Sequence, residues 1–193
     1  GSESAATRQP GPLCVCLRVS GAEQPVEVTL EPETAGSFRA GVRMPPAREI
    51  TERELAFGGR RGRLPVVRME GISHGILTPG SVFFELRQDR IAAEQAARAW
   101  CGELEAEGLG LMFLEGEAPS VRLTPLVYVP GSGTVFWENS CASGSSAVGM
   151  YLAAQTGAPV QFELQQPGGV LRVTSDPDQG ETWLYGRVRR LTE

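Results

Sequence analysis

The sequence contains one histidine and four cysteines, and this scarcity argues against a zinc site. Structural zinc is usually held by four Cys or His ligands in two spaced pairs. Here Cys14 and Cys16 form one pair, whereas Cys101 and Cys141 each stand alone. Because Cys14 and Cys16 lie two apart on a predicted strand, their side chains share a face, and we expect both to be small buried hydrophobes. We therefore expect no bound metal.

Long apolar runs and an excess of positive charge are also missing. A helix that crosses a bilayer needs about 20 consecutive apolar residues, and the apolar runs of this chain have the length of strands. Lys and Arg number 18 against 23 Asp and Glu, which gives a formal net charge of −5 and argues against a broad phosphate-binding surface. We expect neither a membrane nor a nucleic acid as partner. The polar start of the chain has no signal-peptide pattern, so a cytoplasmic location is expected.

What is present is the composition of a globular protein. The 193 residues are 41% apolar and 21% charged, which excludes wholesale disorder. Helical spacing predicts helices over 88–106 and 143–156. Residues 45–63 are charged and begin at two prolines, and we interpret them as a connector between sub-domains. Many short strands and few helices are typical of an α+β fold rather than a doubly wound sheet. The strands are predicted at 13–19, 26–30, 38–43, 65–70, 75–78, 109–114, 121–129, 134–138, 160–165, 169–174 and 181–190.

The second predicted helix, 143–156, is apolar nearly all round. Its apolar residues point in most directions, and they are Ala147, Val148, Met150, Leu152, Ala153 and Ala154. A helix of this kind is expected to be buried on every side. We therefore expect a strongly curved sheet that wraps around it.

Cys141 lies at or just before the start of this helix. Unpaired backbone N–H groups and the positive end of the helix dipole meet there. Both favour a thiolate and predict a thiol pKa below its free value; the same N–H groups could bind a ligand carboxylate. The alternative is an ordinary helix start, capped by Ser140 or Ser143, with an unremarkable cysteine beside it.

Four segments resemble the diaminopimelate epimerase superfamily, which comprises racemases and epimerases that work without pyridoxal phosphate. Residues 140–147 (SCASGSSA) resemble the family's A-C-G-T-G-A-type motif, although Ala142 stands where the family has glycine. Residues 66–77 (VVRMEGISHGIL) are similar to its N-P-H element, and 167–174 (PGGVLRVT) to its terminal hairpin. Residues 137–141 (WENSC) look closer to the amino-acid racemase branch, which includes histidine racemases.

The resemblance implies a diaminopimelate-epimerase-like fold: a curved, mostly antiparallel sheet around a central helix. It also implies a two-cysteine mechanism, with a thiolate on one face of the substrate α-carbon and a thiol on the other. No cofactor is implied. By resemblance Cys141 is catalytic, and the residues expected to bind an amino-acid substrate are Ser73, His74, Glu138, Asn139, Ala142, Ser143, Gly144 and Ser145.

The family has two similar halves, each of which provides one cysteine, and only Cys141 lies in a suitable motif here. The chain is therefore expected to be a C-terminal portion. Residues 1–12 would be a disordered lead or tag, 13–63 strands of the N-terminal half with a connector, and 64–193 the C-terminal racemase-like domain. Alone it would be inactive, and it would need an N-terminal half-domain or a second subunit, with a homodimer as one possibility. Two alternatives are a binding or structural protein of the same fold and a double-bond isomerase of a small carboxylic acid.

Overall fold

The computed structural model describes residues 11–18, 24–34, 36–117 and 120–190. Most of the expected lead, 1–12, lies outside these ranges. Within them, neither helix is long and apolar enough to cross a membrane.

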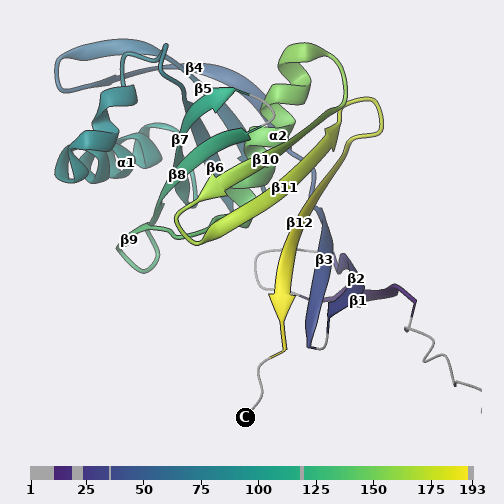
Figure 1. The fold of residues 1–193 in the computed structure, drawn as a ribbon. Helices are drawn as coiled ribbons and strands as arrows, with labels where there is room; N and C mark the ends of the chain where they lie inside the picture. Colours follow the sequence, from purple (N-terminus) through teal and green to yellow (C-terminus); the bar gives the residue numbers. More distant parts are fainter. Residues whose placement is uncertain (1–10, 19–23, 35, 118–119, 191–193) are drawn as a thin grey trace, which may run out of the picture.

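Twelve strands form a single curved sheet (Figure 1). Along the sheet the order is β1-β2-β3-β12-β11-β10-β8-β7-β6-β5-β4, and β9 pairs with β8. The pairs β6–β7 and β8–β10 are parallel, and the other pairs are antiparallel. The strands are β1 (Leu13–Leu17), β2 (Val26–Thr34), β3 (Ser37–Met44), β4 (Glu49–Phe57), β5 (Arg60–Met69), β6 (Ile72–Leu77), β7 (Leu109–Glu117), β8 (Ser120–Val129), β9 (Thr134–Trp137), β10 (Val160–Gln166), β11 (Gly169–Asp176) and β12 (Glu181–Arg189).

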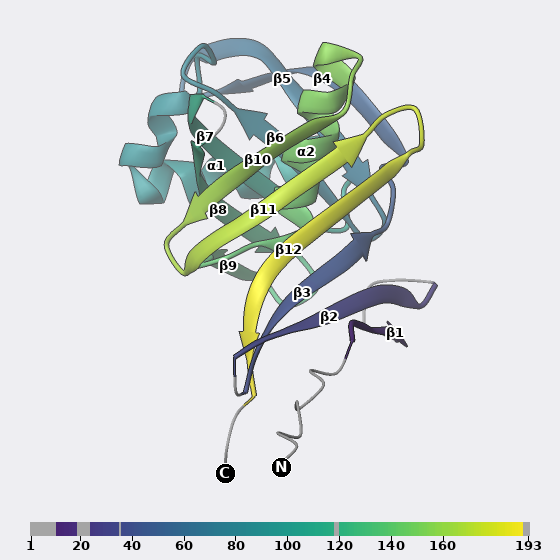
Figure 2. The same cartoon turned by 45° about the vertical axis from the view of Figure 1, so that its right-hand side comes forward.

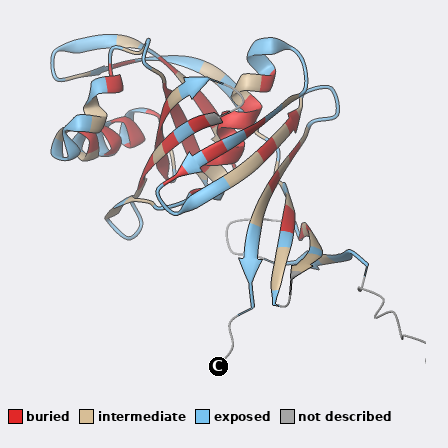
Figure 3. Ribbon diagram, in the orientation of Figure 1, coloured by how far each residue is buried: buried red, intermediate tan, exposed pale blue. Residues whose placement is uncertain are grey.

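Helix α2 (Ala142–Thr156) lies inside the curve of the sheet, as Figures 1 and 2 show from two sides. It packs against β5, β6 and β7 on one side and against β10, β11 and β12 on the other. Residues 144–150 are all buried, and Figure 3 shows this stretch of the helix in red. The left-handed Gly157 (φ 62°) ends it. The expected α+β fold, with a curved and mostly antiparallel sheet around a central helix, is confirmed.

Helix α1 (Arg90–Glu103) covers the opposite face of the sheet, after the short 3-10 helix η1 (Phe84–Gln88). It begins later than the predicted 88–106 because Asp89 caps it, accepting a hydrogen bond from Ala92 N–H at 3.0 Å, and it ends earlier, at Glu103. Alternate residues of β7 separate the two cores: Phe113 packs in the cluster that contains α1, whereas Met112 packs in the cluster that contains α2. The two helices thus lie on opposite faces of the same strands.

The predicted connector 45–63 is for the most part a β-hairpin, which corrects that expectation. Strands β4 and β5 pair over their whole length and turn at Gly58 and Gly59, which have φ angles of 57° and 77°. These positive φ angles suit glycine in a two-residue hairpin turn. Most charged side chains of the hairpin are exposed, while Leu55 and Leu64 are buried in the core. Because charged residues dominate both strands, the sequence did not show the alternation of buried and exposed side chains that identifies a strand.

Cys14 and Cys16 are exposed, not buried as the sequence suggested. They lie on β1, an edge strand that pairs with β2 alone. In Figure 2, β1 and β2 project away from the body of the molecule. Because the two cysteine side chains lie on the same face of a projecting edge strand, both thiols are accessible to water.

Candidate active site

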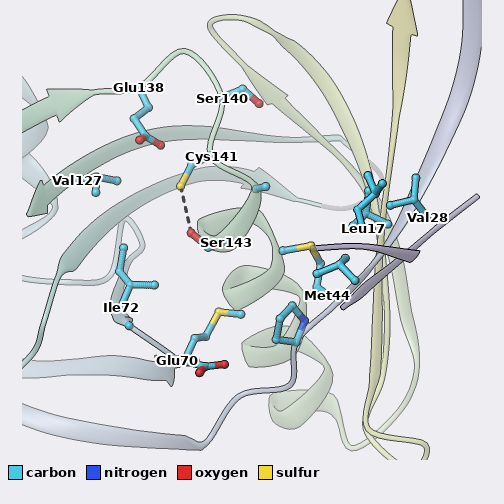
Figure 4. Close-up of a pocket in the computed structure, with 16 residues that line it drawn as sticks. Leu17, Val28, Met44, Glu70, Ile72, Val127, Glu138, Ser140, Cys141 and Ser143 are labelled. Carbon is cyan, nitrogen blue, oxygen red and sulfur yellow. Dashed lines mark hydrogen bonds between the residues drawn. The ribbon is translucent and has the colours of Figure 1, made fainter. Parts of the chain in front are cut away.

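Cys141 is the N-cap residue of α2 and borders a pocket. Its backbone is extended (φ −123°, ψ 108°), and its Sγ accepts a hydrogen bond from Gly144 N–H at 3.4 Å. The Ser143 hydroxyl lies 3.7 Å from the same sulfur, as the dashed line in Figure 4 marks. The side chain is only 5% exposed. The sulfur is thus surrounded by the first turn of its own helix.

The pocket has a volume of about 630 Å³ and two chemically different walls. One wall is apolar and comes largely from the projecting strands, with Leu17, Val28 and Met44 facing inward (Figure 4). The other contains Cys141 and its neighbours. The remaining lining residues are Val26, Val42, Pro45, Met69, Glu70, Gly71, Ile72, Val127, Glu138, Ser140, Ala142 and Ser143. The pocket can hold a small molecule with one polar end.

Glu138 directs its carboxylate at the Cys141 thiol (Figure 4). Burial, and then the hydrogen bond and negative charge of Glu138, raise the pKa of that thiol to about 12. The Gly144 N–H and the Ser143 hydroxyl act in the opposite direction. The expectation of a lowered pKa at the helix start was wrong, because loss of water and a neighbouring carboxylate outweigh the helix-end donors. In this state Cys141 is a neutral thiol.

Some backbone N–H groups at the start of α2 donate within the helix start itself, and others belong to residues that line the pocket. Gly144 N–H is used by Cys141 Sγ, and Ser145 N–H by the Cys141 carbonyl at 3.0 Å. Ala142 and Ser143 supply first-turn N–H groups, which a helix leaves without an intrahelical acceptor. Both residues line the pocket. They are therefore the donors that a ligand carboxylate could meet.

The structure brings only part of the predicted set to the pocket. Glu138, Ala142 and Ser143 line it beside Cys141. Gly144 and Ser145 are buried beneath it and shape the helix start. A Cβ on Gly144 would lie 2.2 Å from the Met112 sulfur and 3.1 Å from Cys141 Sγ, so any other residue there would require the Met112 side chain to move. The exposed Asn139 is not among the lining residues.

Ser73 and His74 do not reach this pocket, contrary to the family resemblance. Ser73 is 5% exposed and borders a neighbouring polar hollow that also contains Arg68. His74 has no exposed surface and packs against Gly110, where a Cβ would come within 2.3 Å of its Nδ1. Both side chains are buried, and neither lines the pocket that contains Cys141.

The burial of His74 gives a prediction for acid stability. Among the described residues neither of its ring nitrogens has a hydrogen-bond partner, and burial lowers its pKa from 6.5 to about 3. The unfolded chain therefore binds a proton near pH 6.5 that the folded chain does not accept until about pH 3. The contribution of the neutral His74 side chain to the free energy of unfolding is therefore complete above pH 6.5. It is lost as the pH falls, at about 1.4 kcal/mol per pH unit between pH 6 and 4.

Urea unfolding at pH 7, 6, 5 and 4 measures this slope. Because carboxylates also titrate in this range, a His74→Leu variant is the control, and its free energy of unfolding should fall less steeply by about that amount. Parallel curves for the two proteins would contradict the assignment.

Sequence reasoning missed two kinds of residue. The apolar wall was missed because Leu17, Val28 and Met44 belong to strands far from the motif in sequence. Gln166 was missed because its contact with Cys141, described below, spans 25 residues and leaves no local signal. Glu138 was predicted as a substrate contact; it lines the pocket, and after burial it is the next cause of the raised pKa of the Cys141 thiol.

Solved structures share this fold at low sequence identity. A hydroxyproline epimerase from Agrobacterium vitis, solved with bound trans-4-hydroxy-L-proline, aligns with a TM-score of 0.59 at 15% identity, covering 94% of this chain and 58% of that one. A protein from Pseudomonas aeruginosa described as a predicted epimerase aligns with a TM-score of 0.55 at 16% identity, covering 97% and 70%. A phenazine biosynthesis protein of the PhzF family from Bacillus anthracis gives 0.53 at 10% identity, covering 93% and 69%.

Curated relatives are histidine racemases. The protein from Staphylococcus aureus is 27% identical over 135 residues, which cover 69% of this chain and 48% of the racemase. A protein from Fusobacterium nucleatum is 26% identical over 182 residues, which cover 92% of this chain and 63% of the racemase. The chain thus spans between about half and just under two thirds of the length of these relatives.

A protein-family model matches most of the chain. The model of the histidine racemase CntK N-terminal domain matches residues 2–185. Because it is the model of an N-terminal domain, the expectation of a C-terminal half was wrong. That expectation rested on a single cysteine motif, and a motif that recurs in both halves cannot tell one half from the other. The chain belongs to the family of histidine racemase CntK N-terminal domains.

Proposed function

We propose that this chain forms one half of a cofactor-independent amino-acid racemase in which Cys141 exchanges a proton with the substrate α-carbon. The observation that carries the proposal is the placement of a thiol at a helix N-terminus, in a pocket, with a carboxylate beside it. Racemisation needs an acid–base group on each face of the α-carbon. Cys141 supplies one. The other comes from a complementary half, since the match covers 48% and 63% of the relatives' length, or alternatively from a second copy of the chain.

The helix start binds the substrate carboxylate in this mechanism. The N–H groups of Ala142 and Ser143 donate to it and stabilise the charge that grows on it as the α-proton leaves. The α-carbon then lies over Cys141 Sγ, whose raised pKa keeps it protonated and ready to donate. When the thiol gives up its proton, Gly144 N–H and Ser143 stabilise the resulting thiolate. In the reverse direction that thiolate removes the proton from the opposite enantiomer.

Charge in the pocket supports an amino acid with a cationic or proton-donating side chain. Glu138 and Glu70 line the pocket, Glu70 with the Arg48 guanidinium 3.8 Å away, and no Lys, Arg or His is among the described lining residues. A carboxylate can pair with the substrate ammonium, and pairing with Glu138 would also relieve its effect on the thiol. The relatives are histidine racemases, so we propose histidine as the first substrate to test.

Deuterium uptake at the α-carbon tests the function directly. L-Histidine and D-histidine are incubated in deuterated buffer with this chain alone, and with the chain joined to or mixed with the complementary half-domain. We expect exchange at the α-carbon only where both acid–base groups are present. Absence of exchange from all common amino acids in both samples would favour a binding protein of the same fold.

A further inference from the structure

The hairpin between β10 and β11 reaches the Cys141 loop through one buried side chain. Gln166, the last residue of β10, is 8% exposed. Its Oε1 accepts a hydrogen bond from Cys141 N–H at 2.9 Å, and its Nε2 donates to Ser145 Oγ at 3.0 Å. Ser145 Oγ in turn donates to the Cys141 carbonyl at 2.6 Å. The three bonds form a closed ring around the backbone of Cys141.

In this ring, the donor and the acceptor of each hydrogen bond are fixed. Since the Gln166 amide must accept from one partner and donate to the other, its orientation is determined, and the Ser145 hydroxyl must point its proton at the Cys141 carbonyl. Ser145 is completely buried. Both polar groups of the Cys141 backbone are therefore held by side chains, in addition to the helix bond from Ser145 N–H.

A second contact attaches the same hairpin to the same loop. Gly168 N–H donates to the Asn139 carbonyl at 2.7 Å. A Cβ on Gly168 would lie 3.0 Å from that carbonyl oxygen, so the two backbones are in close contact. The segment 139–141 is thus held at one end by the last residue of β10 and at the other by the turn that follows it.

We propose that Gln166 is a positioning residue, which fixes the direction of the Cys141 side chain toward the substrate by holding the Cys141 N–H. The effect on turnover rests on the proposed function, whereas the effect on the thiol does not. Cys141 has extended φ and ψ angles next to a helical residue. Rotation about these bonds would change both the Sγ contact with Gly144 N–H and the approach of Glu138. An anchored N–H resists that rotation.

The variant that tests this is Gln166→Met, which keeps the length of the side chain and removes both polar atoms. Labelling of Cys141 by iodoacetamide, followed by peptide mass spectrometry from pH 7 to 10, reports on the thiol without need of turnover. Burial is the first cause of the raised pKa of Cys141, and a loosened loop admits water. We therefore expect Cys141 to label at least tenfold faster at pH 8, with its pH profile shifted to lower pH.

Gln161→Leu is the matched control, because Gln161 is an exposed glutamine on the same strand. It should leave the labelling profile unchanged. In the active racemase, Gln166→Met should lower kcat at least tenfold and change KM less than threefold, because Ala142 and Ser143 still bind the carboxylate. A Cys141 profile that overlays the unmodified protein, or one that Gln161→Leu shifts equally, would overturn the proposal.

If Gln166→Met does not fold, the labelling experiment is carried out with Ser145→Ala instead. It removes one corner of the ring and keeps the Gln166 contact with Cys141 N–H, so we expect a smaller shift in the same direction. No shift in a folded Ser145→Ala protein would overturn the proposal. A protein without racemase activity in which Gln166→Met still shifts the labelling profile would refute the proposed function and leave the positioning role intact.

Discussion

Replacing Cys141 with serine should lower racemisation by the complete enzyme on the order of a thousandfold. A serine hydroxyl is a much weaker acid than a thiol and does not form the anion that must remove the α-proton in the reverse direction. The pocket and the first-turn donors of α2 would otherwise persist, since serine differs from cysteine only in the γ atom. The loss should therefore appear in kcat with little change in KM.

Circular dichroism, started separately from L- and D-histidine, measures the two directions of this reaction. Both should be lost together, because Cys141 acts as the acid in one direction and as the base in the other. Cys16→Ser is the control, since Cys16 is an exposed thiol outside the lining of the pocket. Retention of more than a tenth of the activity in Cys141→Ser would show that another group does the chemistry.

Cys141 should be alkylated far more slowly than the thiols on β1, the opposite of the order that the sequence suggested. Its pKa of about 12 leaves very little thiolate at pH 8, and its side chain is 5% exposed. Cys14 and Cys16 are exposed to solvent. Since each pKa unit changes the thiolate fraction about tenfold, we expect Cys16 to label on the order of a thousandfold faster than Cys141 in this chain.

The variant Glu138→Gln tests the cause of the slow alkylation of Cys141. The carboxylate raises the pKa of Cys141 by a hydrogen bond and by its charge, so an amide at this position should lower the pKa and speed labelling of Cys141 about tenfold at pH 8. Labelling of Cys16 should not change, which gives an internal standard in each digest. Labelling of Cys141 as fast as Cys16 in the unmodified protein would contradict the buried, neutral thiol.

The sequence predicted the central helix and the strands around it well, because their patterns are local. Helix α2 differs from its predicted range by one residue, since an apolar stretch rich in alanine ends at a clear Gly157 signal. Strand β10 alternates buried and exposed residues along its length, which is the pattern of a half-buried strand. The hairpin of β4 and β5 was missed because Arg and Glu side chains dominate it and its buried residues are few.

The candidate site was predicted only where chain neighbours form it. Glu138, Cys141 and Ser143 lie within six residues and were found. The contributions that depend on long-range contacts were not: the apolar wall from β2 and β3, the anchor at Gln166, and the dehydration that determines the state of the thiol. A helix start indicates where an anion could be stabilised, whereas the thiol pKa depends on everything that excludes water from it.

The pairing of β3 with β12 has a consequence for how the chain folds. Their eight-residue ladder joins Ser37–Met44 to the last strand, and it includes an ion pair at 2.6 Å between Arg43 and Glu181, which are 138 residues apart. The entropy of closing so long a loop must be overcome before these contacts form. During synthesis β3 therefore lacks a partner on one edge until β12 leaves the ribosome, so the apolar wall of the pocket joins the body late, and until then this open strand edge favours aggregation.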